Sequence, residues 1–317
     1  MNSVRNTENY HLKYWYDDNQ SNIWRTTNLD STVMSVGGCT RTPMALRAEL
    51  IRNARCLYRD FSDLTIFMSV GLDSEIALRS FLAAGIQPKL ATVKFVDDNN
   101  NYDIGPMLTM VERLGLKCHI IDFDPQSFFD SGECYDIANR YQSYSFYQQI
   151  LLKVAEQFAA PMITIDEVEL EKVPIVNWET GEHKFEWSFL KKEDQDGVWR
   201  RFVDKTGIPA LNNFYTYSPE SMLAFLQEET VAKLIRDQIP GKLGWTSSKM
   251  KIYSSLGYQF RPRPKWHGME NYYHLWDAVL YNISYNGLTY EPRYYKVPAL
   301  DLEQNLINGI QTICQVA

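Results

Sequence analysis

The sequence offers little cysteine or histidine chemistry. Its five cysteines are widely spaced and contain no CxxC pair, and its five histidines show no spacing typical of metal ligands. Zinc frameworks and disulfide networks are therefore not expected, and each thiol is predicted to be a small buried hydrophobe in its reduced form. The cysteines are Cys39, Cys56, Cys118, Cys134 and Cys314.

The sequence also lacks long apolar runs, internal repeats and low-complexity linkers. No segment approaches the roughly 20 apolar residues of a membrane span, and the polar start, MNSVRNTENY, has no apolar signal-peptide core. With 45% hydrophobic and 22% charged residues, the composition is that of a globular protein. We expect a cytoplasmic protein without a membrane partner.

Positive charge is in the minority, since the formal net charge is −7. This balance argues against non-specific binding to a nucleic-acid backbone. One stretch departs from it: between Lys233 and Lys265, eight basic residues stand against one acid, Asp237. Such a stretch either lines a pocket for a small anion or forms a solvated face, and charge alone favours neither.

What is present, from residue 43 onward, is an alternation of short apolar runs with helical periodicity. Helices stopping at Gly85 and Gly115 separate buried strands, which is typical of a parallel sheet. We therefore predict an α/β fold with an open, mainly parallel sheet and helices on both faces. The predicted strands are 64–68, 89–96, 117–123 and 161–165, and the predicted helices are 43–60, 75–84, 106–114 and 141–159.

The flanking regions are less regular. Residues 8–36 read as short strands, 173–178 and 183–189 as a hairpin, and Ser218 as the start of a helix. Further helices are predicted at 270–285 and 301–315. The predicted organisation is an N-terminal extension (1–42), an α/β nucleotide domain (43–170) and an irregular α+β cap that carries substrate specificity (171–317).

The informative segment is Ser69–Glu75, between the first of these strands and its helix. A loop leaving the carboxyl end of a strand and entering a helix presents unpaired backbone N–H groups to an anion. Gly71 allows close approach, and the hydroxyls of Ser69 and Ser74 add donors. Asp73 suits a bridging Mg²⁺ better than a phosphate. The same residues also form an ordinary helix cap, so position between strand and helix is what favours anion binding.

These residues, SVGLDS at 69–74, resemble the SGGxDS signature of the PP-loop ATP pyrophosphatases, a family that includes asparagine synthetases, NAD and GMP synthetases, tRNA thiolases and deazapurine synthases. The resemblance extends over about residues 45–170, through the Asn/Asp-rich turn and the leucine-glycine helix end within 92–124. The chain is also similar to stand-alone PP-loop proteins of large tailed bacteriophages, which would place it in the host cytoplasm.

The resemblance implies a set of site residues. Ser69, Gly71, Leu72, Asp73 and Ser74 would hold the departing phosphates of ATP. Backbone groups of Val93 and Phe95 would read adenine, and Asp166 and Glu167 would join Asp73 in binding Mg²⁺. From the basic stretch, Lys265, Lys249 and Arg263 are candidates to stabilise charge on the phosphates. Val70 departs from the family pattern, which has glycine, and valine would be strained there if the loop needs positive φ.

The implied activity is adenylation of a carbonyl or carboxylate, with release of pyrophosphate, followed by attack of ammonia or an amine. ATP and Mg²⁺ are the expected cofactors, and the acceptor is a small molecule or a nucleobase. Three alternatives remain: sulfur transfer to a nucleobase, modification of a nucleic acid bound through the basic stretch, and a degenerate nucleotide-binding protein without catalysis. The oligomeric state is left open.

Overall fold

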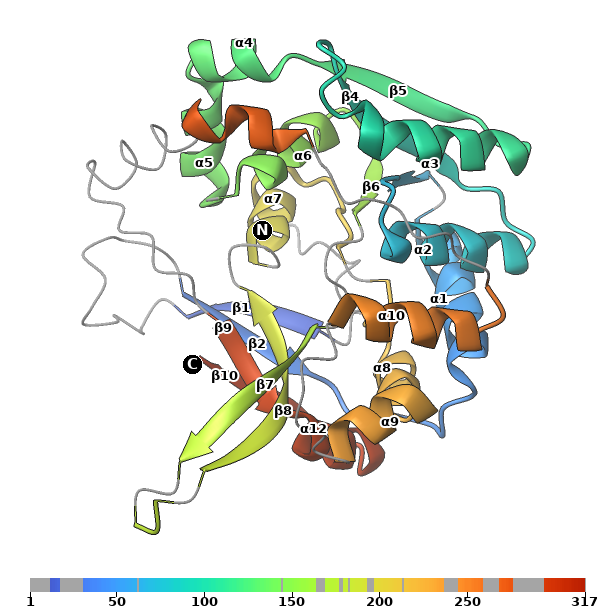
Figure 1. Ribbon diagram of the computed structural model, residues 1–317, viewed down its shortest axis with the longest axis vertical. Helices are drawn as coiled ribbons and strands as arrows, with labels where there is room; N and C mark the ends of the chain where they lie inside the picture. Colours follow the sequence, from blue (N-terminus) through green and yellow to red (C-terminus); the bar gives the residue numbers. More distant parts are fainter. Residues whose placement is uncertain are drawn as a thin grey trace.

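The computed structural model of the protein describes residues 12–17, 31–61, 63–143, 145–163, 169–176, 179–181, 183–192, 197–212, 214–236, 245–258, 268–275 and 294–316. Within these ranges the chain forms a four-stranded sheet with helices on both faces and a six-stranded sheet beside it (Figure 1). No helix in the described ranges is long and apolar enough to cross a membrane.

The four-stranded sheet is parallel throughout. Its order is β5-β4-β3-β6, formed by β3 (Leu64–Phe67), β4 (Lys89–Phe95), β5 (Cys118–Phe123) and β6 (Ala160–Ile163). Beyond β6, Leu211 forms one further parallel bridge with Met162, and its carbonyl accepts from the Ile163 N–H at 2.7 Å. All four carboxyl ends therefore lie at one edge, where the first loop leads from β3 into α2 (Leu72–Ala83).

Helices cover both faces of this sheet. Because side chains alternate along a strand, Leu64, Ile66 and Leu90 pack with α1 (Leu46–Asp60), α2 and α3 (Asn101–Arg113). Phe67, Ala91 and Val93 belong to a second core, with the helices α4 (Pro125–Asp130), α5 (Glu133–Tyr141), α6 (Phe146–Ala155) and α7 (Val198–Thr206). The predicted α/β fold with a parallel, helix-flanked sheet is confirmed.

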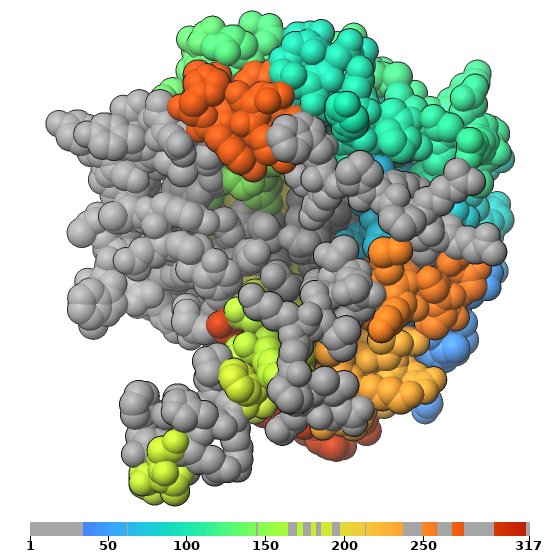
Figure 2. Space-filling model, in the orientation of Figure 1, coloured from blue at the N-terminus to red at the C-terminus, as the bar shows by residue number. Residues whose placement is uncertain are grey.

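The six-stranded sheet joins segments from both ends of the chain. Its order is β1-β2-β10-β9-β8-β7, and the pairs are antiparallel. Its strands are β1 (Leu12–Asp17), β2 (Ser31–Val36), β7 (Glu169–Val176), β8 (His183–Lys192), β9 (Tyr294–Pro298) and β10 (Thr312–Val316). The predicted hairpin is confirmed as β7–β8, which projects from the body (Figure 1, Figure 2).

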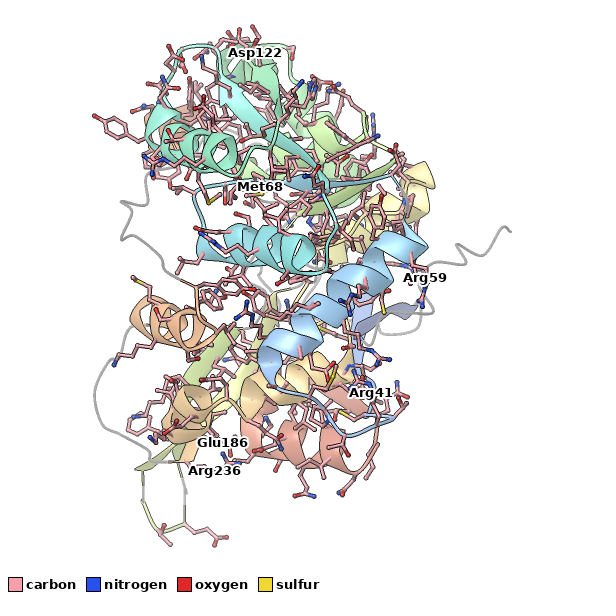
Figure 3. The ribbon with its side chains drawn as sticks, turned by 90° about the vertical axis from the view of Figure 1, so that its right-hand side faces the viewer. Arg41, Arg59, Met68, Asp122, Glu186 and Arg236 are labelled. Carbon is pink, nitrogen blue, oxygen red and sulfur yellow. The ribbon has the colours of Figure 1, made fainter. Side chains whose placement is uncertain are left out.

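The remaining helical elements all follow α7 in the chain. They are α8 (Pro219–Leu226), α9 (Glu229–Arg236), α10 (Trp245–Ser255), the 3₁₀ turn η3 (Met269–Tyr272) and α12 (Ala299–Ile307). The predicted start at Ser218 is confirmed, because its side chain accepts from the Ser221 N–H and forms a capping box. Figure 3 shows α1 crossing the middle of the molecule, with Arg59 in its last turn.

Several predicted helix boundaries were wrong. The helix predicted at 141–159 is only α6, Phe146–Ala155, because Gln142 adopts a left-handed φ of 52° and ends the preceding helix, α5, at Tyr141. The helix at 301–315 ends at Ile307, since Gly309 has a φ of 68° and the chain then pairs with β2 as β10. α3 begins at Asn101, with Pro106 inside it. Of the helix predicted at 270–285, residues 276–285 lie outside the described ranges.

Candidate functional site

The loop between β3 and α2 is closed by its own serines. The Gly71 N–H donates to Ser69 Oγ at 3.1 Å, and Ser74 Oγ lies 3.0 Å from the carbonyl oxygens of Ser69 and Gly71. Ser74 is buried, so its hydroxyl holds the loop together. Leu72, Asp73 and Ser74 form the first turn of α2, where the helix supplies no carbonyl for their N–H groups. These N–H groups define an anion-binding geometry.

Glycine and valine in this loop have roles that the sequence did not reveal. Gly71 is the N-cap residue of α2, with φ −62° and ψ 146°, so it needs no left-handed backbone. A Cβ atom there would lie 3.0 Å from Ser69 Oγ, which makes space its requirement. Val70 is buried and is not among the described residues with positive φ, so valine is tolerated without backbone strain.

Asp73 is bound by two side chains of α10. Lys249 Nζ lies 3.1 Å from Asp73 Oδ2, and the Tyr253 hydroxyl donates to Asp73 Oδ1. The Asp73 and Lys249 side chains are only 16% and 11% exposed, which places the ion pair mostly out of water. Tyr253 in turn stacks on Tyr215, with ring centroids 5.7 Å apart. Lys249 was a predicted site residue, whereas Tyr253 and Tyr215 were not.

The end of α10 is fastened to α1 and α2. Tyr258 is buried, and the guanidinium groups of Arg47 and Arg79 lie 5.2 Å and 5.7 Å from its ring centroid. Arg47 also donates to the Leu256 carbonyl at 3.2 Å. α10 therefore lies along α2 and carries Lys249 to the start of that helix (Figure 1, Figure 2).

At the end of β4, one backbone group of each predicted adenine-reading residue, Val93 and Phe95, already has a side-chain partner. The buried side chain of Asn100 accepts from the Phe95 N–H at 2.9 Å and donates to the Val93 carbonyl at 2.9 Å. An amide presents one donor and one acceptor side by side, so Asn100 satisfies both backbone groups at once. Asn100 stood inside the Asn/Asp-rich turn in the sequence, and its side-chain role was missed.

Residues 268–275 pack onto this turn. Gly268 approaches so closely that a Cβ there would lie 2.5 Å from the Asn99 carbonyl oxygen. The Tyr272 ring packs edge-on against Phe95, and its hydroxyl is hydrogen-bonded to Asp97 and Asn99. Burial, followed by the Asp97 hydrogen bond, raises the pKa of Tyr272 to about 12, so the hydroxyl stays protonated. Two segments from later in the sequence therefore lie at the carboxyl edge of the sheet. α10 contacts the helix turn that follows β3, and residues 268–275 contact the turn that follows β4.

Four of the predicted site residues lie outside the part of the chain that the structure describes. These are Asp166, Glu167, Arg263 and Lys265. Within the described ranges, no group of three or more histidine, cysteine, aspartate and glutamate side chains could hold a metal ion. Both oxygens of Asp73 also have partners already. The described residues therefore do not form a magnesium site by themselves.

The sequence matches no protein-family model and no curated protein.

Proposed function

We propose that the protein binds ATP with its triphosphate on the 69–74 loop and cleaves it between the α- and β-phosphates. One observation carries this proposal. Lys249, which lies 176 residues after Asp73 in the sequence, contacts the Asp73 side chain in the first turn of α2. The mostly buried Lys249 ammonium contacts the side chain of Asp73, in a helix turn whose N–H groups have no helix carbonyl as partner. This combination supports polyphosphate binding, because the ammonium and the N–H groups both favour negative charge and little water screens them.

In the proposed reaction, a carbonyl or carboxylate oxygen of the substrate attacks the α-phosphorus. The bond from that phosphorus to the bridging oxygen breaks, and the electron pair leaves with pyrophosphate. Lys249 and the N–H groups of Leu72 and Asp73 stabilise this departing charge. Ammonia or an amine then displaces AMP from the adenylated substrate, and no strong protein base is needed.

The Asn100 side chain limits how a nucleobase could bind at the end of β4. Because the Phe95 N–H already donates to the Asn100 side chain, adenine can use that donor only by displacing Asn100. This feature also favours a second candidate, a degenerate nucleotide-binding protein without catalysis. Sulfur transfer gains no support from Cys39, Cys118 or Cys314, since burial raises the pKa of these three thiols to about 12 and suppresses the reactive thiolate.

The test is release of pyrophosphate and AMP from ATP by the full-length protein, with fractionated cell metabolites as acceptors. Lys249→Met is expected to reduce the rate about 100-fold, the typical effect of losing one group that stabilises transition-state charge. Lys89→Met is the control, since Lys89 pairs with Asp63 at the amino end of β3, away from the loop. ATP binding without pyrophosphate in any fraction would support the non-catalytic candidate, and absence of ATP binding would refute both.

A further inference from the structure

The contacts of Asp73 disagree with the role that the PP-loop resemblance gives it. One carboxylate oxygen accepts from the Tyr253 hydroxyl and the other lies 3.1 Å from Lys249 Nζ. Both partners come from α10, and the stack of Tyr253 on Tyr215 fixes the hydroxyl. Asp73 is therefore bound as the counter-ion of a lysine.

A metal ion at Asp73 would meet two obstacles. It would have to share carboxylate oxygens that already accept from Tyr253 and Lys249, and it would stand close to the Lys249 ammonium. Two positive charges at such a distance repel strongly where water is scarce. The neighbouring acid, Glu75, is buried and pairs with Arg79 at 2.6 Å, so it is not directed to a metal either.

We propose that Lys249 is the resident cation of this site and that polyphosphate binds to it without a divalent metal. Asp73 is then a positioning residue, which holds the ammonium at the first turn of α2. The inference rests on the proposed phosphate site, but it concerns how charge is balanced there and not whether ATP is cleaved.

The two roles of Asp73 predict opposite effects of Asp73→Asn. Asparagine keeps the shape of the side chain and can still accept from Tyr253 or Lys249, but it removes one negative charge. If Asp73 only positions Lys249, binding of an anion without metal is retained or strengthened. If Asp73 is a metal ligand, binding depends on magnesium and is lost in the variant.

The experiment is calorimetric titration of the full-length protein with inorganic tripolyphosphate, at constant ionic strength, once with EDTA and once with magnesium chloride. For the wild type we expect affinities in the two buffers within about threefold of each other. Lys249→Met should weaken binding in EDTA by about tenfold or more, the scale of a charge-assisted contact, and Lys249→Arg should restore part of it. Lys233→Met, which removes an exposed lysine of α9 paired with Glu229, is the matched control.

The outcomes separate this inference from the proposed function. Binding that requires magnesium and disappears in Asp73→Asn would overturn the resident-cation role and leave the ATP site standing. If tripolyphosphate binds in neither buffer, both the resident-cation role of Lys249 and the proposed ATP site are refuted. Thermal unfolding of each variant shows whether it is folded, and Asp73→Asn retaining metal-free binding supports the inference even if Lys249→Met does not fold.

Discussion

At the scale of single residues, Gly71 provides space for the loop. Its backbone is in the ordinary extended region, so alanine is conformationally allowed, but the new Cβ would press on Ser69 Oγ at 3.0 Å. We expect Gly71→Ala to displace the Ser69 hydroxyl from the Gly71 N–H. Tripolyphosphate affinity should fall about tenfold, while stability changes by only about 1 kcal/mol, the value of one hydrogen bond.

Gly105→Ala is the matched control for this variant. Gly105 lies inside α3, and nothing is within 4 Å of the position its Cβ would take. Alanine there should raise helix stability by about 0.5–1 kcal/mol and leave phosphate affinity unchanged. Calorimetric titration and urea unfolding of both variants check the pair. Equal phosphate affinity in the two would show that the loop does not depend on the space at Gly71.

Val70 is the residue at which the chain departs from the SGGxDS pattern. Restoring glycine is not expected to improve the loop, because Val70 is buried and shows no positive φ. Val70→Gly removes a buried side chain and adds backbone freedom to the unfolded state. The free energy of unfolding should therefore fall by about 2–4 kcal/mol. A variant that unfolds at the wild-type urea concentration and releases more pyrophosphate would contradict this expectation.

At the scale of elements, Asn100 joins the end of β4 to the start of α3. Asn100→Ala leaves the Phe95 N–H and the Val93 carbonyl without their side-chain partner, and the loss should cost about 2–4 kcal/mol of stability. If adenine competes with Asn100, the same variant should bind ATP more tightly relative to tripolyphosphate. Thermal unfolding and the ratio of the two affinities test both effects.

Thr109→Ala serves as the control for Asn100→Ala. Its hydroxyl donates to the Gly105 carbonyl on an exposed part of α3, so both effects should be absent. An ATP-to-tripolyphosphate ratio that is the same in Asn100→Ala and in the wild type would show that the base does not use the end of β4.

The sequence predicted elements well where the signal is local. The strands β3, β4 and β5 are short apolar runs, and the last two follow helices that end at Gly85 and Gly115, so their positions followed from neighbouring residues. β10 was missed because Thr312–Val316 is a strand through its pairing with β9 and with β2, the latter some 276 residues earlier. For the same reason the basic stretch around Lys249 could be noticed, but its contact with Asp73 could not, since only the packing of α10 on α2 creates it.

At the scale of the whole molecule, the N-terminal strands are not separate from the C-terminal region. β2 pairs with β10, and the Cys39 N–H donates to the Leu306 carbonyl at 3.0 Å. Between them Gly38 lies against Gly309 so tightly that a Cβ on Gly38 would stand 2.0 Å from the Gly309 carbonyl carbon. Backbone atoms cannot move aside as a flexible side chain can, so this contact requires glycine.

Gly38→Ala should therefore separate the chain ends and disturb the six-stranded sheet. We expect the free energy of unfolding to fall by roughly 3 kcal/mol, the upper range for overpacking a rigid contact. If the 43–170 region folds as its own domain, urea unfolding of the variant will show two transitions, and tripolyphosphate binding will survive the first. If the sheet and the α/β part are one cooperative unit, a single transition moves to lower urea and binding is lost with it. An unchanged unfolding curve would contradict the close approach of Gly38 to Gly309.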